Sequence, residues 1–293
     1  MASTATSLLD QSAPAAGVAP VAPLTLAPVA VPLPLPTTLT PSKISAFTSC
    51  PLAFRFSVLE RLPEPPSLPA VRGTLVHRAL QLLFTYVDGG SRTRVRAEEA
   101  LQDAFADLTA RDSDLAGLQL TPEGSDVLMR QAGVLLDRYF EIEDPNSVRP
   151  AGLELDMQVS VDGLNLRGII DRLDVLADGR FAVVDYKTGR APRAEQAKSR
   201  LSGVQLYAFL CEEILGQRPA AVRLLYLRDR VVVSAEPSDM SMRGVRQRAA
   251  AVWKAIERAC EHSDFRPSPS ALCNWCAFQA YCPAFGGDPD APR

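Results

Sequence analysis

The chain of 293 residues is 47% hydrophobic and 22% charged, a balance typical of soluble globular proteins. No run of about eighteen apolar residues is uninterrupted, so we expect no membrane span. The formal net charge of −3 argues against a protein that coats nucleic acid through bulk electrostatics, although it does not exclude a local basic groove. We expect a cytoplasmic protein, in which six cysteines are better explained as ligands or core residues than as disulfides.

Residues 1–38 consist mainly of Ala, Pro, Val, Leu, Ser and Thr, and Asp10 is their only charged side chain. A secretory signal would need basic residues before an unbroken apolar stretch, whereas here prolines interrupt the apolar residues repeatedly. We therefore predict a disordered, partly polyproline-like tail over 1–38 and a single domain over 39–293.

The domain is predicted to begin with helices. Thr40 or Ser42 would cap a first helix that ends near Cys50. Apolar residues at three- and four-residue spacing then predict helices over 72–88, 94–112 and 123–142. These helices form a helical N-terminal part over about 42–145.

Strands follow the helices. Two turn signals, Asp162-Gly163 and Ala177-Asp178-Gly179, divide residues 152–187 into three predicted strands. After them we expect a helix over about 194–215 that stops at Gly216, a strand pair, a helix over about 239–261, and a C-terminal cysteine segment over about 263–287. This order predicts one α/β domain.

Two aspartates and a lysine lie around the second turn. A three-residue loop over 177–179 places Asp171 opposite Asp185, with Lys187 on the same face. A two-residue loop would shift the register and separate the carboxylates. Opposed carboxylates repel each other unless a cation lies between them, and such oxygen ligands suit Mg²⁺ or Mn²⁺. A cross-strand salt bridge on an exposed hairpin is the simpler alternative.

Other polar residues are ambiguous by themselves. His77 lies in a predicted helix, where a lone histidine is more often packed or solvent-facing than a ligand. Basic residues outnumber the single acid between Lys187 and Arg200, and they would line either a groove or a solvated helix face. Cys211 and Cys260 are predicted to be small buried core residues.

The other four cysteines have the spacing of a metal site. Cys273, Cys276 and Cys282 lie within ten residues, and both Cys50 and Cys282 precede a proline. A Cys-Pro step is typical of the end of ferredoxin cluster motifs. Zinc sites usually combine two close cysteine pairs, so the spacing favours an iron–sulfur cluster, while zinc stays open.

Six motifs in this order carry a family resemblance: "SAFTSCP", "GTLVH", "GIIDRLD", "VVDYKTG", "QLYAF" and a C-terminal "CxxCxxxxxCP". They resemble RecB-family nucleases of the PD-(D/E)XK superfamily, in the subgroup with an iron–sulfur cluster that includes the AddB nuclease domain and CRISPR-adaptation nucleases. The resemblance covers nearly all of residues 39–287. It implies a restriction-endonuclease-like α/β fold, with a central mixed sheet flanked by helices and with terminal segments joined by the cluster.

The resemblance also implies residue roles. Asp171 and Asp185 would hold Mg²⁺ or Mn²⁺ together with His77, and Lys187 would position the attacking water. Gln205 would contact active-site or DNA groups from the crossing helix. A structural [4Fe–4S] cluster would be held by Cys50, Cys273, Cys276 and Cys282.

The sequence departs from the family pattern on the crossing helix. There the glutamine is often followed four residues later by tyrosine, whereas position 209 is Phe in this chain. Tyr207 lies about 200° around the helix from Gln205, so either the helix is distorted near Gln205 or Tyr207 has no role in the site. We expect Gln205 to take part and leave the role of Tyr207 open.

Two further acids are lesser candidates, Glu154 and Asp174. Asp174 should face away from Asp171, because side chains alternate along a strand, and it would be solvated or paired with Arg172 or Arg180.

The implied function is a metal-dependent DNA exonuclease that acts on single-stranded DNA or DNA ends, in DNA repair and recombination or in CRISPR adaptation. A helicase or CRISPR integrase partner is suggested, because the net charge predicts modest non-specific affinity for DNA. Two alternatives stay open: a DNA- or partner-binding module with the same fold and cluster but weak catalysis, and a zinc-stapled regulatory protein.

Overall fold

The computed structural model describes residues 32–291, with the backbone alone for residue 194 and residues 196–202. The predicted tail lies outside the described residues as far as residue 31. The described end of this tail packs against the folded domain, since the Leu33 N–H donates to the Cys260 carbonyl at 3.0 Å. Across the described range, no helix combines the length and the apolar character that a membrane crossing requires.

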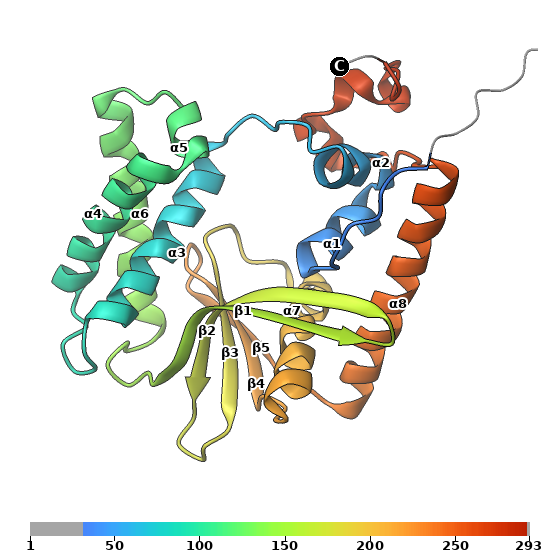
Figure 1. Ribbon diagram of the computed structural model, residues 1–293. Coiled ribbons are helices and arrows are strands. Elements are labelled where there is room, and N and C mark those ends of the chain that lie inside the picture. Colours follow the sequence, from blue (N-terminus) through green and yellow to red (C-terminus); the bar gives the residue numbers. More distant parts are fainter. Residues whose placement is uncertain (1–31, 292–293) are drawn as a thin grey trace, which may run out of the picture.

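A five-stranded mixed sheet forms the centre of the molecule (Figure 1). Its strands lie in chain order and are β1 (Pro150–Val161), β2 (Leu164–Val175), β3 (Phe181–Lys187), β4 (Ala221–Tyr226) and β5 (Val231–Ala235). All neighbours are antiparallel except β3 and β4. Helix α7 (Ala194–Leu215) supplies the crossover that a parallel pair requires, and Gly216 ends it with a φ of 67°.

The second hairpin has the predicted three-residue loop. The Leu176 N–H donates to the Arg180 carbonyl at 2.8 Å, and Gly179 has a φ of +80°, which favours glycine. The pairs from Val175–Phe181 to Arg172–Val184 follow the predicted register. One further step along both strands places Asp171 opposite Asp185.

A helical layer packs on one side of the sheet. It consists of α3 (Leu68–Tyr86), α4 (Arg94–Arg111), α5 (Ser113–Gly117) and α6 (Pro122–Ile142). Their apolar faces share a core with sheet residues that include Val184 and Tyr186. The three predicted helices are confirmed, and the first begins earlier because Ser67 caps it by accepting from the Ala70 N–H.

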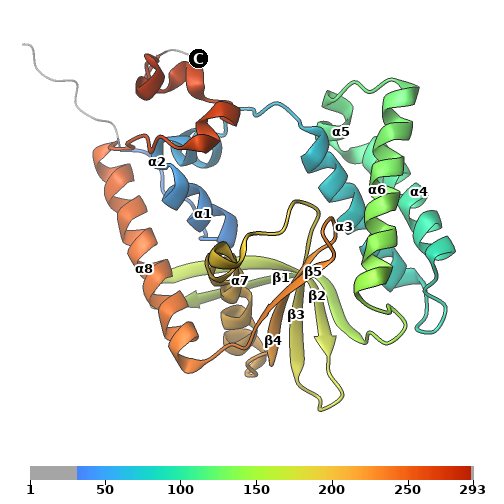
Figure 2. The same cartoon turned by 180° about the vertical axis from the view of Figure 1, so that it is seen from behind.

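The opposite part of the molecule carries both ends of the described chain (Figures 1 and 2). Here lie α1 (Pro41–Ser49), α2 (Pro51–Phe54), the π-helical turn η1 (Arg55–Leu59), α7 and α8 (Asp239–His262). Three short 3₁₀ turns follow α8: η2 (Ala271–Trp275), η3 (Gln279–Tyr281) and η4 (Pro283–Phe285). Thr40 caps α1 by accepting from the Lys43 N–H at 3.1 Å.

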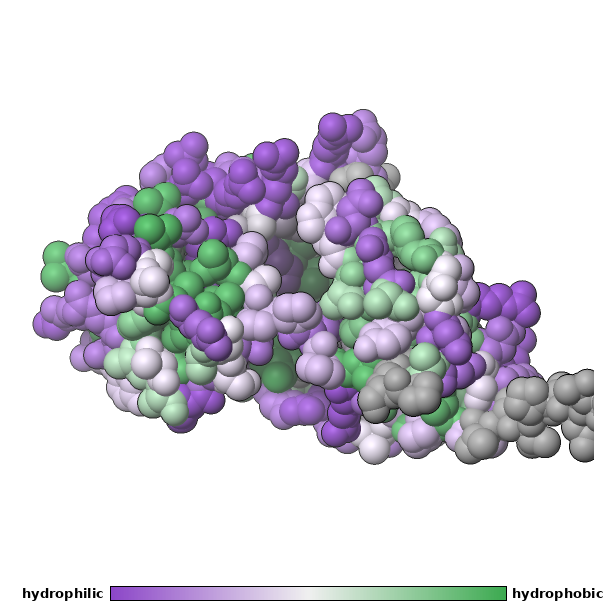
Figure 3. Space-filling view, turned by 90° about the horizontal axis from the view of Figure 1, so that it is seen from above, coloured by the Kyte–Doolittle hydropathy of each residue, from purple (hydrophilic) through white to green (hydrophobic). Residues whose placement is uncertain are grey.

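A hollow separates this part from the helical layer, as Figure 3 shows from above. The linker over residues 62–67, which is rich in proline, joins the two parts across the gap between them (Figures 1 and 2). Helix α3 and the ends of the central strands border this gap.

Candidate active site

Three side chains from three elements meet beside the sheet. His77 on α3, Glu154 on β1 and Asp171 on β2 each offer one ligand atom, and these atoms lie within 4.8 Å of one another. His77 Nδ1 is 3.4 Å from Asp171 Oδ2. In the described part of the chain this is the only such group of His, Cys, Asp or Glu residues. One imidazole and two carboxylates are ligands that divalent cations accept.

Glu154 reaches this group through an unusual backbone conformation. It lies inside β1, yet its φ of 48° is in the left-handed region that a residue with a side chain seldom adopts. Such a conformation costs on the order of 1–3 kcal/mol and persists where the surrounding structure requires it. From the sequence, Glu154 is a lesser candidate than Asp171 and Asp185, because nothing in the sequence indicates this backbone conformation.

Asp171 is fixed where the β2–β3 ladder ends. Its Oδ2 accepts a hydrogen bond from the Tyr186 backbone N–H at 2.7 Å, so the side chain replaces a ladder contact. Burial opposes protonation of His77, but the hydrogen bond and negative charge of Asp171 outweigh it and raise the pKa of His77. The predicted approach of His77 to Asp171 is therefore present in the structure.

Asp185 and Lys187 lie beside these three residues. Lys187 Nζ is 2.5 Å from Asp185 Oδ2, and the Asp185 side chain is only 4% exposed. Asp185 Oδ2 is shielded from solvent and accepts no well-aligned hydrogen bond from the described residues. Burial and the negative charge of Asp171 raise the pKa of Asp185 to about 6, against the opposing charge of Lys187.

The candidate active site has an excess of negative charge. Burial and the charge of Asp171 also raise the pKa of Glu154 to about 6. Three carboxylates thus lie close together. The positive charges that oppose the rise in pKa are His77 and Arg78 for Glu154, and Lys187 and His77 for Asp185. A divalent cation would remove this repulsion, so the donor set fits the metal that the resemblance implies.

On α7, Tyr207 is close enough to the carboxylates to be affected by their charge. Burial and then the negative charges of Asp185, Asp171 and Glu154 raise the pKa of Tyr207. No hydrogen bond joins the half-buried Gln205 side chain to another described residue. The sequence left the part of Tyr207 open, and in the structure its ring lies against Gly168 of β2, where it feels the charge of the carboxylates.

A buried arginine lies behind the site, on the other face of β2. Arg172 is fully buried and binds both carboxylate oxygens of Asp174, at 2.8 and 3.0 Å. It also lies 2.6 Å from Glu143 of α6 and donates to the hydroxyls of Tyr186 and Tyr139 at 2.7 and 3.2 Å. The prediction that Asp174 faces away from Asp171 and pairs with an arginine is confirmed.

This network reaches the site through Tyr186. The Tyr186 ring packs edge-on against the His77 ring, with centroids 5.8 Å apart, while its backbone N–H holds Asp171. Arg172 therefore connects α6 and β2 to Tyr186, which contacts both His77 and Asp171.

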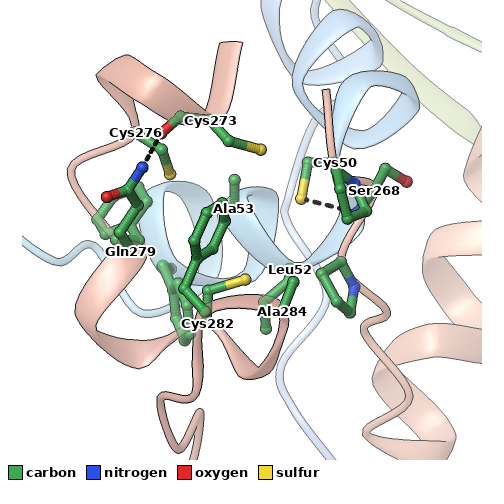
Figure 4. Close-up of a pocket in the computed structure, with 14 residues that line it drawn as sticks. Cys50, Leu52, Ala53, Ser268, Cys273, Cys276, Gln279, Cys282 and Ala284 are labelled. Atoms are coloured by element: carbon green, nitrogen blue, oxygen red, sulfur yellow. Dashed lines mark hydrogen bonds between the residues drawn. The ribbon is translucent and has the colours of Figure 1, made fainter. Parts of the chain in front are cut away.

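The four predicted cluster cysteines line one pocket (Figure 4). Cys273, Cys276 and Cys282 come from the C-terminal turns, and Cys50 comes from the junction of α1 and α2. Two of the sulfurs accept backbone N–H groups: Cys50 from Ser268 at 3.5 Å and Cys273 from Ser270 at 3.3 Å. The C-terminal segment is also packed onto η1, since the Phe56 ring lies 5.5 Å from Phe278 and 5.9 Å from Tyr281.

The other two cysteines, Cys211 and Cys260, are buried in the core, as predicted. In the basic segment after Lys187, Arg190 and Arg193 are exposed. Lys198 and Arg200 belong to the same predicted groove, but their side chains lie outside the described residues.

Two curated relatives of the chain are phage proteins. Gene 69 protein of Mycobacterium phage D29 is 23% identical over 266 residues, which are 83% of this chain and 96% of that protein. Gene 69 protein of Mycobacterium phage L5 is 26% identical over 149 residues, which are 50% of this chain and 47% of that protein. A crystal structure of a candidate exonuclease from Eubacterium rectale has a TM-score of 0.52 at 12% identity, over 82% of this chain and 86% of that one. This last likeness shows a shared fold.

The family comparison covers most of the molecule. The model of the PD-(D/E)XK nuclease superfamily matches residues 38–283, a range that includes all the candidate metal ligands and four cysteines discussed above. The mixed five-stranded sheet flanked by helices is the architecture that the resemblance implied. The chain belongs to the PD-(D/E)XK nuclease superfamily.

Proposed function

We propose that this nuclease is a deoxyribonuclease that requires Mg²⁺ or Mn²⁺. The observation that carries the proposal is the convergence of His77, Glu154 and Asp171 within 4.8 Å, with the Asp185–Lys187 pair beside them. A nuclease of this superfamily with this donor set has the residues needed to bind a divalent cation and to orient an attacking water.

Each residue has a distinct task in this proposal. His77, Glu154, Asp171 and Asp185 would hold the cation, which when bound lowers the pKa of a water and offsets charge on the phosphate. Lys187 would orient the attacking water and stabilise charge on the phosphate oxygens. Attack on phosphorus opens the P–O3′ bond and leaves a 3′-hydroxyl and a 5′-phosphate.

The preferred substrate would be a single strand or a DNA end. The linker over 62–67 crosses between the two parts (Figures 1 and 2) that flank the hollow (Figure 3), and an end can enter beneath such a crossing more readily than an internal duplex site. Tyr207, Gln205 and the basic segment after Lys187 would contact this strand.

A [4Fe–4S] cluster held by Cys50, Cys273, Cys276 and Cys282 is a second part of the proposal. Four cysteines around one pocket, two of them accepting backbone N–H groups, suit a cluster. In a zinc site the sulfurs lie only about 3.8 Å apart, given Zn–S bonds of about 2.3 Å. No three cysteine sulfurs among the described residues lie within 4.8 Å of one another, which favours the larger group.

Cleavage of labelled DNA tests the nuclease proposal. Protein purified without oxygen is incubated with end-labelled linear and closed circular single strands, with Mg²⁺, Mn²⁺ or chelator. We expect metal-dependent loss of the linear strands, slower loss of circles, and no cleavage by Asp185→Ala or Lys187→Ala. Full-length circles cut as fast as linear strands would contradict the preference for ends.

The alternative is a module that binds DNA or a partner with weak catalysis. Intact protein with its metal-binding residues and cluster, but without cleavage of any DNA, would favour that alternative. A helicase or integrase partner also stays a prediction, which rests on the net charge of −3. The prediction of a partner fails if the isolated protein binds DNA tightly and degrades it at physiological salt.

A further inference from the structure

An arginine-rich pocket opens beside the end of β3, outside the group of candidate ligands. It has a volume of about 330 Å³, and its polar lining consists of Arg72 on α3, Gln131 and Arg138 on α6, Thr188 after β3 and Arg228 after β4. No acidic side chain lines it.

Among the described residues, Arg72 and Arg138 have no carboxylate partner, and Arg228 has only a long ion pair with Asp229. Arg72 donates to the Gln131 side-chain oxygen at 2.6 Å, and Arg138 donates to the Arg228 carbonyl at 2.7 Å. Arg228 Nε is 4.0 Å from Asp229, beyond hydrogen-bond distance, and Asp229 instead accepts the Ala191 N–H at 2.6 Å.

Arg72 has a further unused donor. Its Nε–H is shielded from solvent and has no hydrogen-bond partner among the described residues. A buried donor without a partner is costly. Three positive charges and an unused donor around one open pocket indicate an anion as the missing ligand.

The pocket adjoins the candidate active site. Thr188 directly follows Lys187, and a Cβ atom on Gly73 would lie 3.2 Å from Thr188 Oγ1, so α3 closely approaches the end of β3. His77 lies about one helical turn beyond Gly73 on the same helix. A DNA strand that presents one phosphate to Asp185 and Lys187 would therefore pass close to this pocket.

We propose that Arg72, Arg138 and Arg228 bind a DNA phosphate that neighbours the phosphate being cut. The inference rests on the proposed function and deepens it, because it assigns a substrate-positioning subsite to the helical layer. The planar guanidinium fork suits two oxygens of one phosphate, and the Thr188 hydroxyl adds a neutral donor. This subsite would hold the strand in register while leaving the chemistry to the neighbouring carboxylates.

The test measures binding separately from cleavage. A fluorescent single-stranded oligonucleotide is titrated in chelator against wild-type protein, the double variant Arg138→Gln/Arg228→Gln, and the control Arg243→Gln on the exposed face of α8. We expect the double variant to bind about tenfold more weakly and the slope of log affinity against log salt to fall by about 0.7 for the lost phosphate contact. The control removes a charge far from the pocket and should change neither value.

A second measurement locates the phosphate. Oligonucleotides with one neutral methylphosphonate at successive positions are compared in the same assay. One position should weaken binding to wild-type protein but have no effect on the double variant. Equal salt slopes and equal methylphosphonate profiles for both proteins overturn the inference while leaving the nuclease proposal intact. Wild-type protein that binds no DNA contradicts both proposals.

Discussion

Glu154 connects an unfavourable backbone conformation to a chemical task. Its φ of 48° inside β1 turns its carboxylate toward His77 and Asp171, where burial and charge repulsion raise its pKa to about 6. A strained residue among crowded carboxylates is stabilised when a cation is bound. Metal affinity is therefore the property that should respond first to a change at this position.

The substitution Glu154→Gln should raise the Mn²⁺ concentration needed for half-maximal DNA cleavage by about 10- to 100-fold, as for groups that support a metal site. The amide keeps the size of the side chain but loses the negative charge. Glu141→Gln on the exposed face of α6 is the matched control, with no expected change. An unchanged metal requirement for Glu154→Gln would exclude Glu154 as a ligand.

Arg172 should matter for stability. Its replacement by Met leaves Asp174 and Glu143 without their buried cation, a loss that costs about 3–5 kcal/mol of unfolding free energy. Arg180→Met removes an exposed ion pair with Asp178 and should cost less than about 1 kcal/mol. Urea unfolding measures both, and equal costs for the two variants would show that the buried network contributes little.

Local patterns in the sequence predicted part of the site. Counting outward from a three-residue loop was enough to bring Asp171 and Asp185 together, because strand register follows from turn length. The positions of Glu154 and Tyr207 depend on a left-handed residue and on how α7 sits against the sheet, and neither is a local pattern. Arg172 was predicted only as a possible partner of Asp174, because arginine is seldom fully buried.

At the scale of elements, α7 lies closely against β2. A Cβ atom on Gly168 of β2 would lie 2.8 Å from the Tyr207 ring and 2.9 Å from Leu210. This contact places Tyr207 beside the carboxylates, and it explains why a glycine occupies a buried strand position.

The substitution Gly168→Ala should lower the unfolding free energy by about 1–3 kcal/mol, because the added methyl group overpacks the contact with α7. Gly203→Ala on α7 is the matched control. Nothing lies within 4 Å of its Cβ position, so this substitution should raise the unfolding free energy by about 0.5–1 kcal/mol. Urea denaturation distinguishes the two. A Gly168→Ala protein as stable as wild type would show that α7 can shift, and that Tyr207 is not held in place.

The elements themselves were largely predictable, because caps, turns and apolar spacing are local. Gly216 ends α7 and Thr40 begins α1 as expected. The parallel pairing of β3 with β4 was not specified, since it depends on the path of a crossover helix. The π-helical turn η1 was also missed, because its pattern of apolar residues differs little from that of an α-helix.

At the scale of the whole molecule, the four-cysteine pocket joins residues more than 200 positions apart, Cys50 and the C-terminal turns. A cluster bound by all four cysteines would therefore hold the two ends of the described fold together. In this proposal, the cluster would hold in place a segment of short 3₁₀ turns whose buried side chain is Phe278.

Protein purified without oxygen should contain about four iron atoms and four sulfides per chain, as a [4Fe–4S] cluster requires. Cys276→Ser should lose most of the iron and melt at a lower temperature, because it removes one ligand of the cluster. Cys211→Ala, in the core away from the pocket, should keep its iron. One zinc per chain instead of iron would contradict the cluster and favour a zinc-stapled fold.

The most direct test of the account is single-turnover cleavage of a 5′-labelled single strand with Mn²⁺, by wild-type protein, Asp171→Asn and Asp156→Asn. Asp156 is an exposed acid on the same sheet, paired with Arg167, and serves as the control. The account predicts that Asp171→Asn slows cleavage by more than about 100-fold, while Asp156→Asn stays within about twofold of wild type. Cleavage by Asp171→Asn at the wild-type rate would show that the chemistry does not take place at this site.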